Sequence, residues 1–168
     1  MYKLAEMDER FHLVHRGSNV LDLGCAPGSW LEYFEEKGAA RILGIDQEPV
    51  LATLKRARVQ RGDVLQEFDS GGEGFDLVVS DLAPKLSGIR DRDDAQMLVL
   101  VARAREIAHQ TLVKGGAFVC KLFDCEEAEK LIRSLKGEFH KIHRFRPKGS
   151  REGSREFYLV ALGRRKAP

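Results

Sequence analysis

The stretch Val20–Trp30, VLDLGCAPGSW, joins an apolar run to a predicted helix through a glycine-containing turn. The run from Asn19 to Leu23 is typical of a buried strand. Gly24, Ala26 and Gly28 follow it directly, and small residues at such a turn let a ligand approach the backbone while helix amides point at that ligand. This unit predicts an α/β fold that binds a nucleotide-like molecule at the turn.

The spacing of the turn narrows the class of ligand. The turn is GxxxG and not the GxGxxG of pyrophosphate binders, and Pro27 removes an amide that a diphosphate needs. Asp46 ends the second strand, 22 residues past Gly24, where a carboxylate accepts hydrogen bonds from ribose hydroxyls. Asp63, after the third strand, is placed to bond an adenine amino group. Each aspartate alone also fits a helix cap or a turn, but together they favour S-adenosylmethionine over NAD.

Strand-like and helix-like patterns alternate along the chain after an amphipathic opening at residues 2–14. Strands are expected at residues 19–23, 41–45, 58–61, 75–80, 117–122, 138–146 and 156–162, and helices at 29–37, 49–56, 93–113 and 126–136. The sequence contains no internal repeat and no linker. The alternation predicts one domain over residues 1–168, with a doubly wound, Rossmann-like, mostly parallel α/β sheet of seven strands whose last strand is antiparallel.

The composition of the 168 residues, 43% hydrophobic and 32% charged, allows one sizeable core. No apolar run approaches the roughly 20 residues that cross a bilayer, and no leader-like segment opens the sequence, so a soluble, cytoplasmic protein is expected. Cys25, Cys120 and Cys125 show neither a CxxC pair nor metal-ligand spacing. Reduced, packed thiols and no metal site are expected.

Positive charge is concentrated at the carboxyl-terminal end. Residues 136–168 hold ten Lys or Arg against three Glu, a net +7, whereas residues 1–135 hold 18 basic and 23 acidic residues, a net −5. Residues 140–155, HKIHRFRPKGSREGSR, mix cations, imidazoles and a phenylalanine with Gly, Ser and Pro. A solvated, solubilising surface is one interpretation. A loop that follows a phosphate chain is the other, and it favours a nucleic acid as partner.

Two ionisable residues lie at strand ends where the ligand is expected. Lys121 ends the run Ala117–Leu122 in GGAFVCKLF, and Asp81 ends the run FDLVVSD before the breaker LAPK. The carboxyl ends of strands in an open α/β sheet border its ligand crevice, so both residues are candidates for an active site. The alternatives are a strand-end lysine paired with Asp124 and an aspartate that only caps the following turn.

Several segments of the chain occur in the same order in one known family. They are YKL at Tyr2–Leu4, VLDLGCAPGSW, GID at Gly44–Asp46, GDV at Gly62–Val64, SDLAPKLSGIRDRD, GGAFVCKLF, and SREFYLVA at Ser154–Ala161. On these motifs the chain resembles the FtsJ/RrmJ family of S-adenosylmethionine-dependent ribose 2′-O-methyltransferases, over nearly all of its length. The resemblance implies the class I methyltransferase fold and S-adenosylmethionine as cofactor.

The resemblance also implies site residues and a substrate. The family's Lys-Asp-Lys-Glu set falls on Lys3, Asp81, Lys121 and Glu156. The implied cofactor-binding residues are Asp22, Gly24, Ala26, Pro27, Gly28, Trp30, Asp46, Asp63 and Asp81. The implied substrate is a uridine ribose in large-subunit ribosomal RNA, either as free RNA or within the large ribosomal subunit. Transfer RNA is the alternative substrate. The protein is expected to be a monomer. Helical spacing by itself places Trp30 and Phe34 in the core.

Two features depart from the family pattern. Relatives have a basic stretch ahead of the YKL lysine, whereas Met1 and Tyr2 alone precede Lys3 here, so a weaker amino-terminal RNA contact and a loosely held Lys3 are expected. Cys25 and Ser29 stand where many relatives have Ala and Gly. These small changes should leave the turn intact.

The chemistry assigns a task to each residue of the set. A sulfonium methyl is already activated, so the enzyme must align a ribose oxygen with it and remove a weakly acidic proton. We expect Lys121 to take that proton and Asp81 to orient its amine. Lys3 and Glu156 should position the ribose, with Glu156 the most dispensable, because it also fits an ordinary surface ion pair with Arg151 or Arg155.

Two other functions stay open at this point. An NAD-dependent oxidoreductase would need a GxGxxG turn and a hydride-handling residue, and the sequence offers neither. A catalytically weak RNA-binding protein that keeps the fold is the second alternative, because of the short amino terminus.

Overall fold

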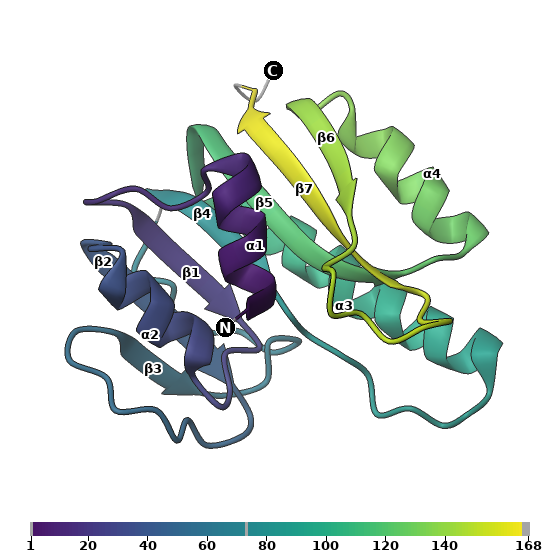
Figure 1. The fold of residues 1–168 in the computed structure, drawn as a ribbon, viewed down its shortest axis with the longest axis horizontal. Helices are drawn as coiled ribbons and strands as arrows, with labels where there is room; N and C mark the ends of the chain where they lie inside the picture. The colour runs from purple at the N-terminus through teal and green to yellow at the C-terminus, as the bar shows by residue number, and fades with distance from the viewer. Residues whose placement is uncertain (1, 73, 166–168) are drawn as a thin grey trace.

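The computed structural model describes residues 2–72 and 74–165. Within them, one sheet of seven strands runs in the order β3-β2-β1-β4-β5-β7-β6 (Figure 1). The strands are β1 (Asn19–Leu23), β2 (Arg41–Asp46), β3 (Arg58–Arg61), β4 (Phe75–Ser80), β5 (Leu112–Phe123), β6 (Phe139–Phe145) and β7 (Glu156–Arg164). β1 to β5 pair in parallel, and β7 is antiparallel to both β5 and β6. The predicted sheet is confirmed.

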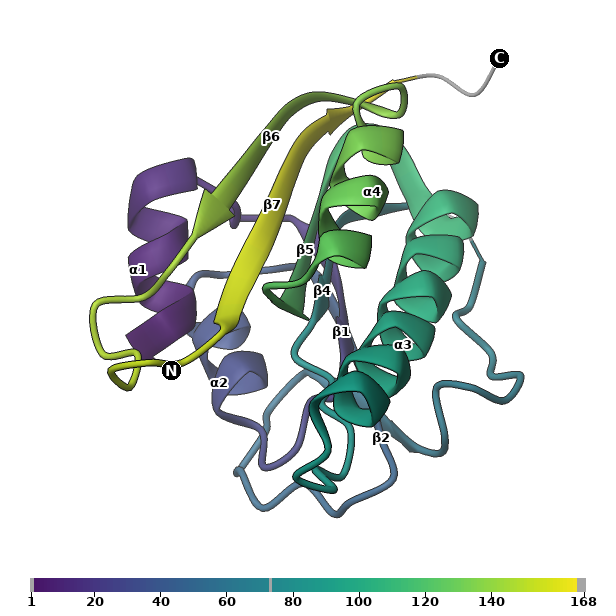
Figure 2. The same cartoon turned by 90° about the vertical axis from the view of Figure 1, so that its right-hand side faces the viewer.

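Helices cover both faces of the sheet (Figure 2). They are α1 (Tyr2–Phe11), α2 (Ser29–Glu36), α3 (Arg90–Thr111) and α4 (Glu126–Leu135). α1 and α2 share one buried apolar cluster with Leu77 of β4, and α3 and α4 share the other with its neighbour Val78. Successive strand residues point to opposite faces, so each strand contributes to both clusters. Among the described residues, no helix combines the length and apolarity that a membrane span requires.

One predicted element is wrong: residues 49–56 form a loop, not a helix. The amides of Leu51 and Ala52 donate to the Pro27 carbonyl oxygen at 2.9 and 3.1 Å. Further on, the amides of residues 55, 56 and 57 all donate to the carboxylate of Glu35. These amides are therefore unavailable for helical hydrogen bonds, and the segment lies over the glycine turn instead.

The remaining elements lie close to their predicted bounds. α3 begins at Arg90 instead of residue 93, and β5 begins at Leu112, ahead of the predicted Ala117. Leu112 pairs with Phe75 across a register shift, so the strand starts irregularly. The amphipathic opening forms the helix α1.

The cysteines are free thiols. Cys25 and Cys120 are buried and Cys125 is partly buried. Burial raises the pKa of the Cys25 and Cys120 thiols above the ordinary range, which favours the neutral form. The expected packing is confirmed for Cys25 and Cys120.

A buried carboxylate fixes α1 against α2. Asp8 accepts hydrogen bonds from the Val14 amide and the Tyr33 hydroxyl, each at 2.8 Å, and the ammonium of Lys37 lies 3.5 Å away. Burial and then Asp8 raise the pKa of the Tyr33 hydroxyl, so this hydroxyl stays a donor. Because α1 carries Lys3 in its first turn, this contact also sets where Lys3 lies.

We expect Asp8→Ala to lower the free energy of unfolding by about 1–3 kcal/mol, because it removes the acceptor of two buried hydrogen bonds. Urea unfolding followed by circular dichroism measures the change, with Glu9→Ala, an exposed neighbour on α1, as control. Equal stability of the two variants would contradict the role given to Asp8.

Candidate active site at the carboxyl edge of the sheet

The turn between β1 and α2 requires glycine at two positions. Gly24 and Gly28 have φ values of +83° and +114°, which other residues rarely adopt. A Cβ atom at Gly28 would lie 2.6 Å from the Cβ of Ala52, and one at Gly24 would lie 2.9 Å from Leu82 Cδ2. The backbone of the turn is thus packed between two loops of the same edge, and this packing by itself requires glycine.

The two predicted ribose and adenine acceptors have local roles as well. Asp46 accepts hydrogen bonds from the amides of Ala26 at 2.8 Å and Glu48 at 2.9 Å. Asp63 accepts one from the Leu65 amide at 2.9 Å. Both aspartates therefore form turn hydrogen bonds, as the alternative interpretation of the sequence predicted. A carboxylate offers about four acceptor positions, so each retains capacity for a ligand.

A cavity of about 500 Å³ places Asp46 and Asp63 on one wall. Its other walls include the aliphatic side chains of Leu65, Leu82 and Val99. Apolar walls with a few convergent polar groups are typical of small-molecule sites, and this combination suits a flat heterocycle joined to a sugar. The structure therefore brings both aspartates to one candidate nucleoside site beside the glycine turn.

Asp22 is the most constrained of the predicted residues. It lies on β1 between Gly44 of β2 and Val79 of β4 and is fully buried. Neither of its carboxylate oxygens has a hydrogen-bond partner in the described part of the chain. Burial, then the charges of Asp81 and Asp46, raise the pKa of Asp22 well above its usual range. This edge of the sheet therefore favours a cationic ligand.

Lys121 and Asp81 form an ion pair across the ends of β5 and β4. The Lys121 Nζ lies 3.2 Å from Asp81 Oδ1 and donates to the Asp81 carbonyl oxygen at 3.1 Å. The lysine side chain is 8% exposed and the aspartate 31%, so the pair borders solvent while the amine stays buried. The alternative partner is excluded because Asp124 pairs with Arg144 and Arg146.

Lys3 and Glu156 form a second, looser pair at the same edge. Lys3 Nζ lies 4.0 Å from Glu156 Oε2, and both side chains are more than one-third exposed. The predicted arginine alternative does not hold for Arg155, which pairs with Asp94 at 2.8 Å. The structure thus brings the Lys-Asp-Lys-Glu set together as two ion pairs.

Tyr158 belongs to the site, although the sequence reasoning missed it. It lies opposite Lys121 in the β5–β7 ladder, and its hydroxyl donates to Asp81 Oδ1 at 2.6 Å. Burial and then Asp81 raise the pKa of this hydroxyl, which keeps it a donor. The usable signal was its place two residues after Glu156, because residues i and i+2 of a strand share a face. Trp30 packs against it with ring centroids 6.0 Å apart, as expected of a core residue.

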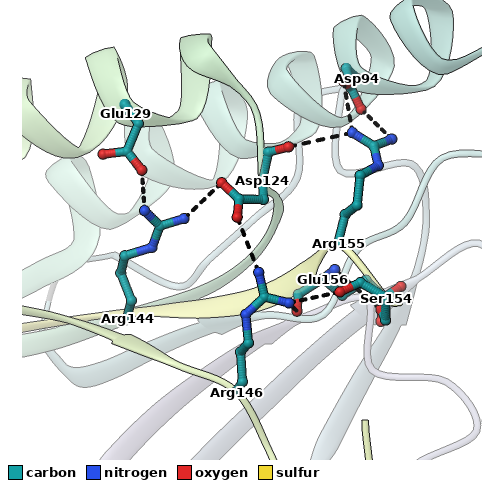
Figure 3. A network of polar contacts seen from close by, with 8 residues as sticks. All are labelled: Asp94, Asp124, Glu129, Arg144, Arg146, Ser154, Arg155 and Glu156. Atoms are coloured by element: carbon teal, nitrogen blue, oxygen red, sulfur yellow. Dashed lines mark hydrogen bonds and ion pairs between the residues drawn. The ribbon is translucent and has the colours of Figure 1, made fainter. Parts of the chain in front are cut away.

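Arginines of the basic segment are engaged within the protein (Figure 3). Arg144 and Arg146 both bind the carboxylate of Asp124, and Arg146 also donates to the carbonyl oxygens of Ser154 and Glu156. These contacts fix the first residues of β7, and therefore the strand end that carries Glu156, beside the end of β5.

The fold is the Rossmann-like fold of S-adenosylmethionine-dependent methyltransferases. A ribosomal RNA methyltransferase of Plasmodium falciparum superposes with a TM-score of 0.85 at 24% identity, covering 97% of this chain and 95% of that one. A TehB-like S-adenosylmethionine-dependent methyltransferase of Corynebacterium glutamicum gives 0.66 at 21% identity, covering 98% and 89%. At these identities the likeness establishes the fold.

Sequence comparison identifies the family. The model of FtsJ-like methyltransferases matches residues 1–164. The chain is 40% identical to the ribosomal RNA large subunit methyltransferase E of Caulobacter vibrioides, over 96% of this chain and 74% of the relative. It is 39% identical to the protein of the same description from Desulforapulum autotrophicum, over 98% and 85%. The chain belongs to the FtsJ-like methyltransferase family.

We expect Asp22→Asn to change the pH dependence of stability. The native pKa of Asp22 lies above its unfolded value of about 3.9, so the native state keeps a proton that the unfolded state releases. The wild type therefore loses stability as pH rises from about 4 through the native pKa. The asparagine variant lacks this loss, so its stability relative to the wild type should increase between pH 5 and pH 8.

Urea unfolding at the two pH values measures this difference, with the exposed Asp91→Asn as control. Calorimetric titration should show weaker S-adenosylmethionine binding by Asp22→Asn, because a carboxyl near a cationic ligand is lost. A variant with the wild-type pH profile and the wild-type affinity would refute this account of Asp22.

Proposed function

We propose that this protein transfers a methyl group from S-adenosylmethionine to the 2′-hydroxyl of a ribose in large-subunit ribosomal RNA. The observation that carries the proposal is the buried Lys121 amine, held 3.2 Å from Asp81 at the sheet edge that also holds the glycine turn. The relatives described as large-subunit ribosomal RNA methyltransferases support the substrate class. The family resemblance further suggests a uridine as the modified nucleotide.

The residues present fit S-adenosylmethionine. Asp46 and Asp63 line the cavity that would take the ribose and adenine, and the backbone around Gly24 and Gly28 leaves no room for a side chain. Burial and then the negative charges of Asp81 and Asp46 raise the pKa of Asp22, and these charges suit a ligand with a sulfonium and an ammonium group. When bound, the cofactor supplies an activated methyl group.

The protein side of the reaction is alignment and proton removal. Asp81 fixes the Lys121 amine from one side, and the Tyr158 hydroxyl fixes Asp81 from the other. Lys121 would take the proton of the ribose hydroxyl during methyl transfer, so its amine must be unprotonated or share its proton at that moment. Lys3 and Glu156 hold the ribose from the solvent side, where their looser pair leaves them free to exchange partners.

We expect Lys121→Ala to lower the single-turnover rate of methyl transfer at least about 100-fold, because a positioned acid–base group contributes 10²–10⁴. Lys121→Arg should be similarly impaired, because a guanidinium keeps the charge but does not accept a proton. The readout is tritium transfer from labelled S-adenosylmethionine to large-subunit ribosomal RNA, both free and within the large ribosomal subunit.

Lys114→Ala is the matched control, because Lys114 is an exposed lysine near the start of the same strand. Calorimetry should show S-adenosylmethionine binding by every variant. A fully folded Lys121→Ala protein that transfers methyl groups at the control rate would exclude the assigned role. Wild-type protein that binds the cofactor and transfers nothing to ribosomal RNA would instead favour transfer RNA or a catalytically weak RNA-binding protein, which the same assay on transfer RNA separates.

A further inference from the structure

Glu35 of α2 binds three consecutive backbone amides of the loop between β2 and β3. Its Oε1 accepts hydrogen bonds from the amides of Lys55 at 3.0 Å, Arg56 at 2.6 Å and Ala57 at 2.7 Å. The Lys55 amide also lies 3.0 Å from Oε2, and the Arg56 guanidinium donates to the Glu35 carbonyl oxygen at 2.8 Å. A single residue therefore fixes the end of the loop that leads into β3.

The place of Glu35 in its helix is otherwise unfavourable for a carboxylate. α2 ends at Glu36, and the negative end of the helix dipole repels an acidic side chain in the last turn. Partial burial alone would raise the pKa of the Glu35 carboxyl, but the hydrogen bonds from the amides of Ala57, Arg56 and Lys55 outweigh it and lower this pKa. The carboxylate therefore stays charged at neutral pH, and the amides of the loop stabilise its charge.

The same loop packs against the glycine turn between β1 and α2. The amides of Leu51 and Ala52 donate to the Pro27 carbonyl oxygen. Ala52 also lies against Gly28 so closely that a Cβ atom at Gly28 would be 2.6 Å from the Cβ of Ala52. The loop thus supports the backbone of the turn, and Glu35 fixes the loop a few residues further along the chain.

We propose that Glu35 is a positioning residue for the cofactor, because it fixes residues 49–57 against the glycine turn and so keeps the turn in the shape that binds S-adenosylmethionine. The inference rests on the proposed function, which assigns the cofactor to this turn. The reacting groups Lys121 and Asp81 come from β5 and from the end of β4. Loss of Glu35 should therefore weaken cofactor binding without slowing methyl transfer in the occupied enzyme.

The test is Glu35→Ala, with Glu36→Ala, its exposed neighbour on α2, as control. If the binding-competent loop is populated about one time in ten, the apparent affinity falls about tenfold. We expect Glu35→Ala to raise both the Kd and the KM for S-adenosylmethionine by about this factor, with kcat unchanged at saturating cofactor and large-subunit ribosomal RNA. Calorimetry measures the Kd, and tritium transfer to the RNA measures KM and kcat.

Hydrogen exchange of the loop separates positioning from a general effect on stability. In Glu35→Ala, the amides of residues 51–57 should exchange faster, whereas those of β4 and β5 should exchange as in the wild type. S-adenosylmethionine should restore part of the protection of the loop. Faster exchange of the loop with unchanged cofactor affinity would overturn the inference and leave Glu35 a purely structural role.

Two further measurements separate the hydrogen bonds of Glu35 from its charge. Glu35→Gln keeps one acceptor oxygen but loses the charge, so it should retain more cofactor affinity than Glu35→Ala, and it also serves as the test if the alanine variant does not fold. S-adenosylhomocysteine lacks the positive sulfonium, and its affinity should fall by the same factor as that of S-adenosylmethionine. Equal losses in the two variants, or a loss confined to the cationic ligand, would assign the effect to charge and overturn the inference.

The outcome for the wild type distinguishes the two levels of the argument. Unchanged affinity in Glu35→Ala, beside a wild type that binds the cofactor and methylates RNA, would overturn the inference and leave the proposed function intact. A wild type that binds neither S-adenosylmethionine nor S-adenosylhomocysteine would overturn the proposed function and this inference together.

Discussion

Negative charge gathered at one edge of the sheet is the constraint on which this site depends. Asp22, Asp46 and Asp81 lie at or near the carboxyl ends of β1, β2 and β4. Burial, and then the charges of Asp81 and Asp46, raise the pKa of Asp22. The protein compensates two of them: backbone amides bind Asp46, and Lys121 with Tyr158 binds Asp81. The carboxyl oxygens of Asp22 have no hydrogen-bond partner among the described residues. A buried polar group without a partner destabilises the folded state, so Asp22 lowers the stability of the fold.

The reversed direction of β7 completes the site. Parallel strands deliver the residues at their carboxyl ends to one edge, which places Asp81 and Lys121 together. A further parallel strand would deliver only its own last residues there. Because β7 runs the other way, its first residues meet the end of β5, with Glu156 opposite Phe123 and Tyr158 opposite Lys121. The clamp of Arg146 on the start of β7 then fixes this junction from outside the ladder.

The sequence predicted the sheet, the glycine turn and the four-residue Lys-Asp-Lys-Glu set, because each rests on local pattern or on motifs. It failed where tertiary contacts decide. Residues 49–56 have a helix-compatible composition, but their amides bind Pro27 and Glu35, which are distant in sequence. The sequence reasoning assigned no role to Tyr158, and only the structure reveals that its hydroxyl reaches Asp81. Asp46 illustrates a different limit of sequence-based prediction. Its carboxylate both accepts turn hydrogen bonds and lines the cavity, and sequence spacing alone does not distinguish these two roles.

The excess of positive charge at the carboxyl-terminal end overstates the number of cations that this segment has available to bind a polyanion. Counting residues treats every arginine as available, whereas Arg144, Arg146 and Arg155 are paired with acids of the protein. Each such exposed pair contributes little to stability, but it lowers the positive potential that a phosphate would meet. The net charge of the segment therefore does not measure its attraction to a phosphate chain. The paired arginines instead have a structural role. Arg146 binds the loop before β7, and Arg155 binds Asp94 near the start of α3.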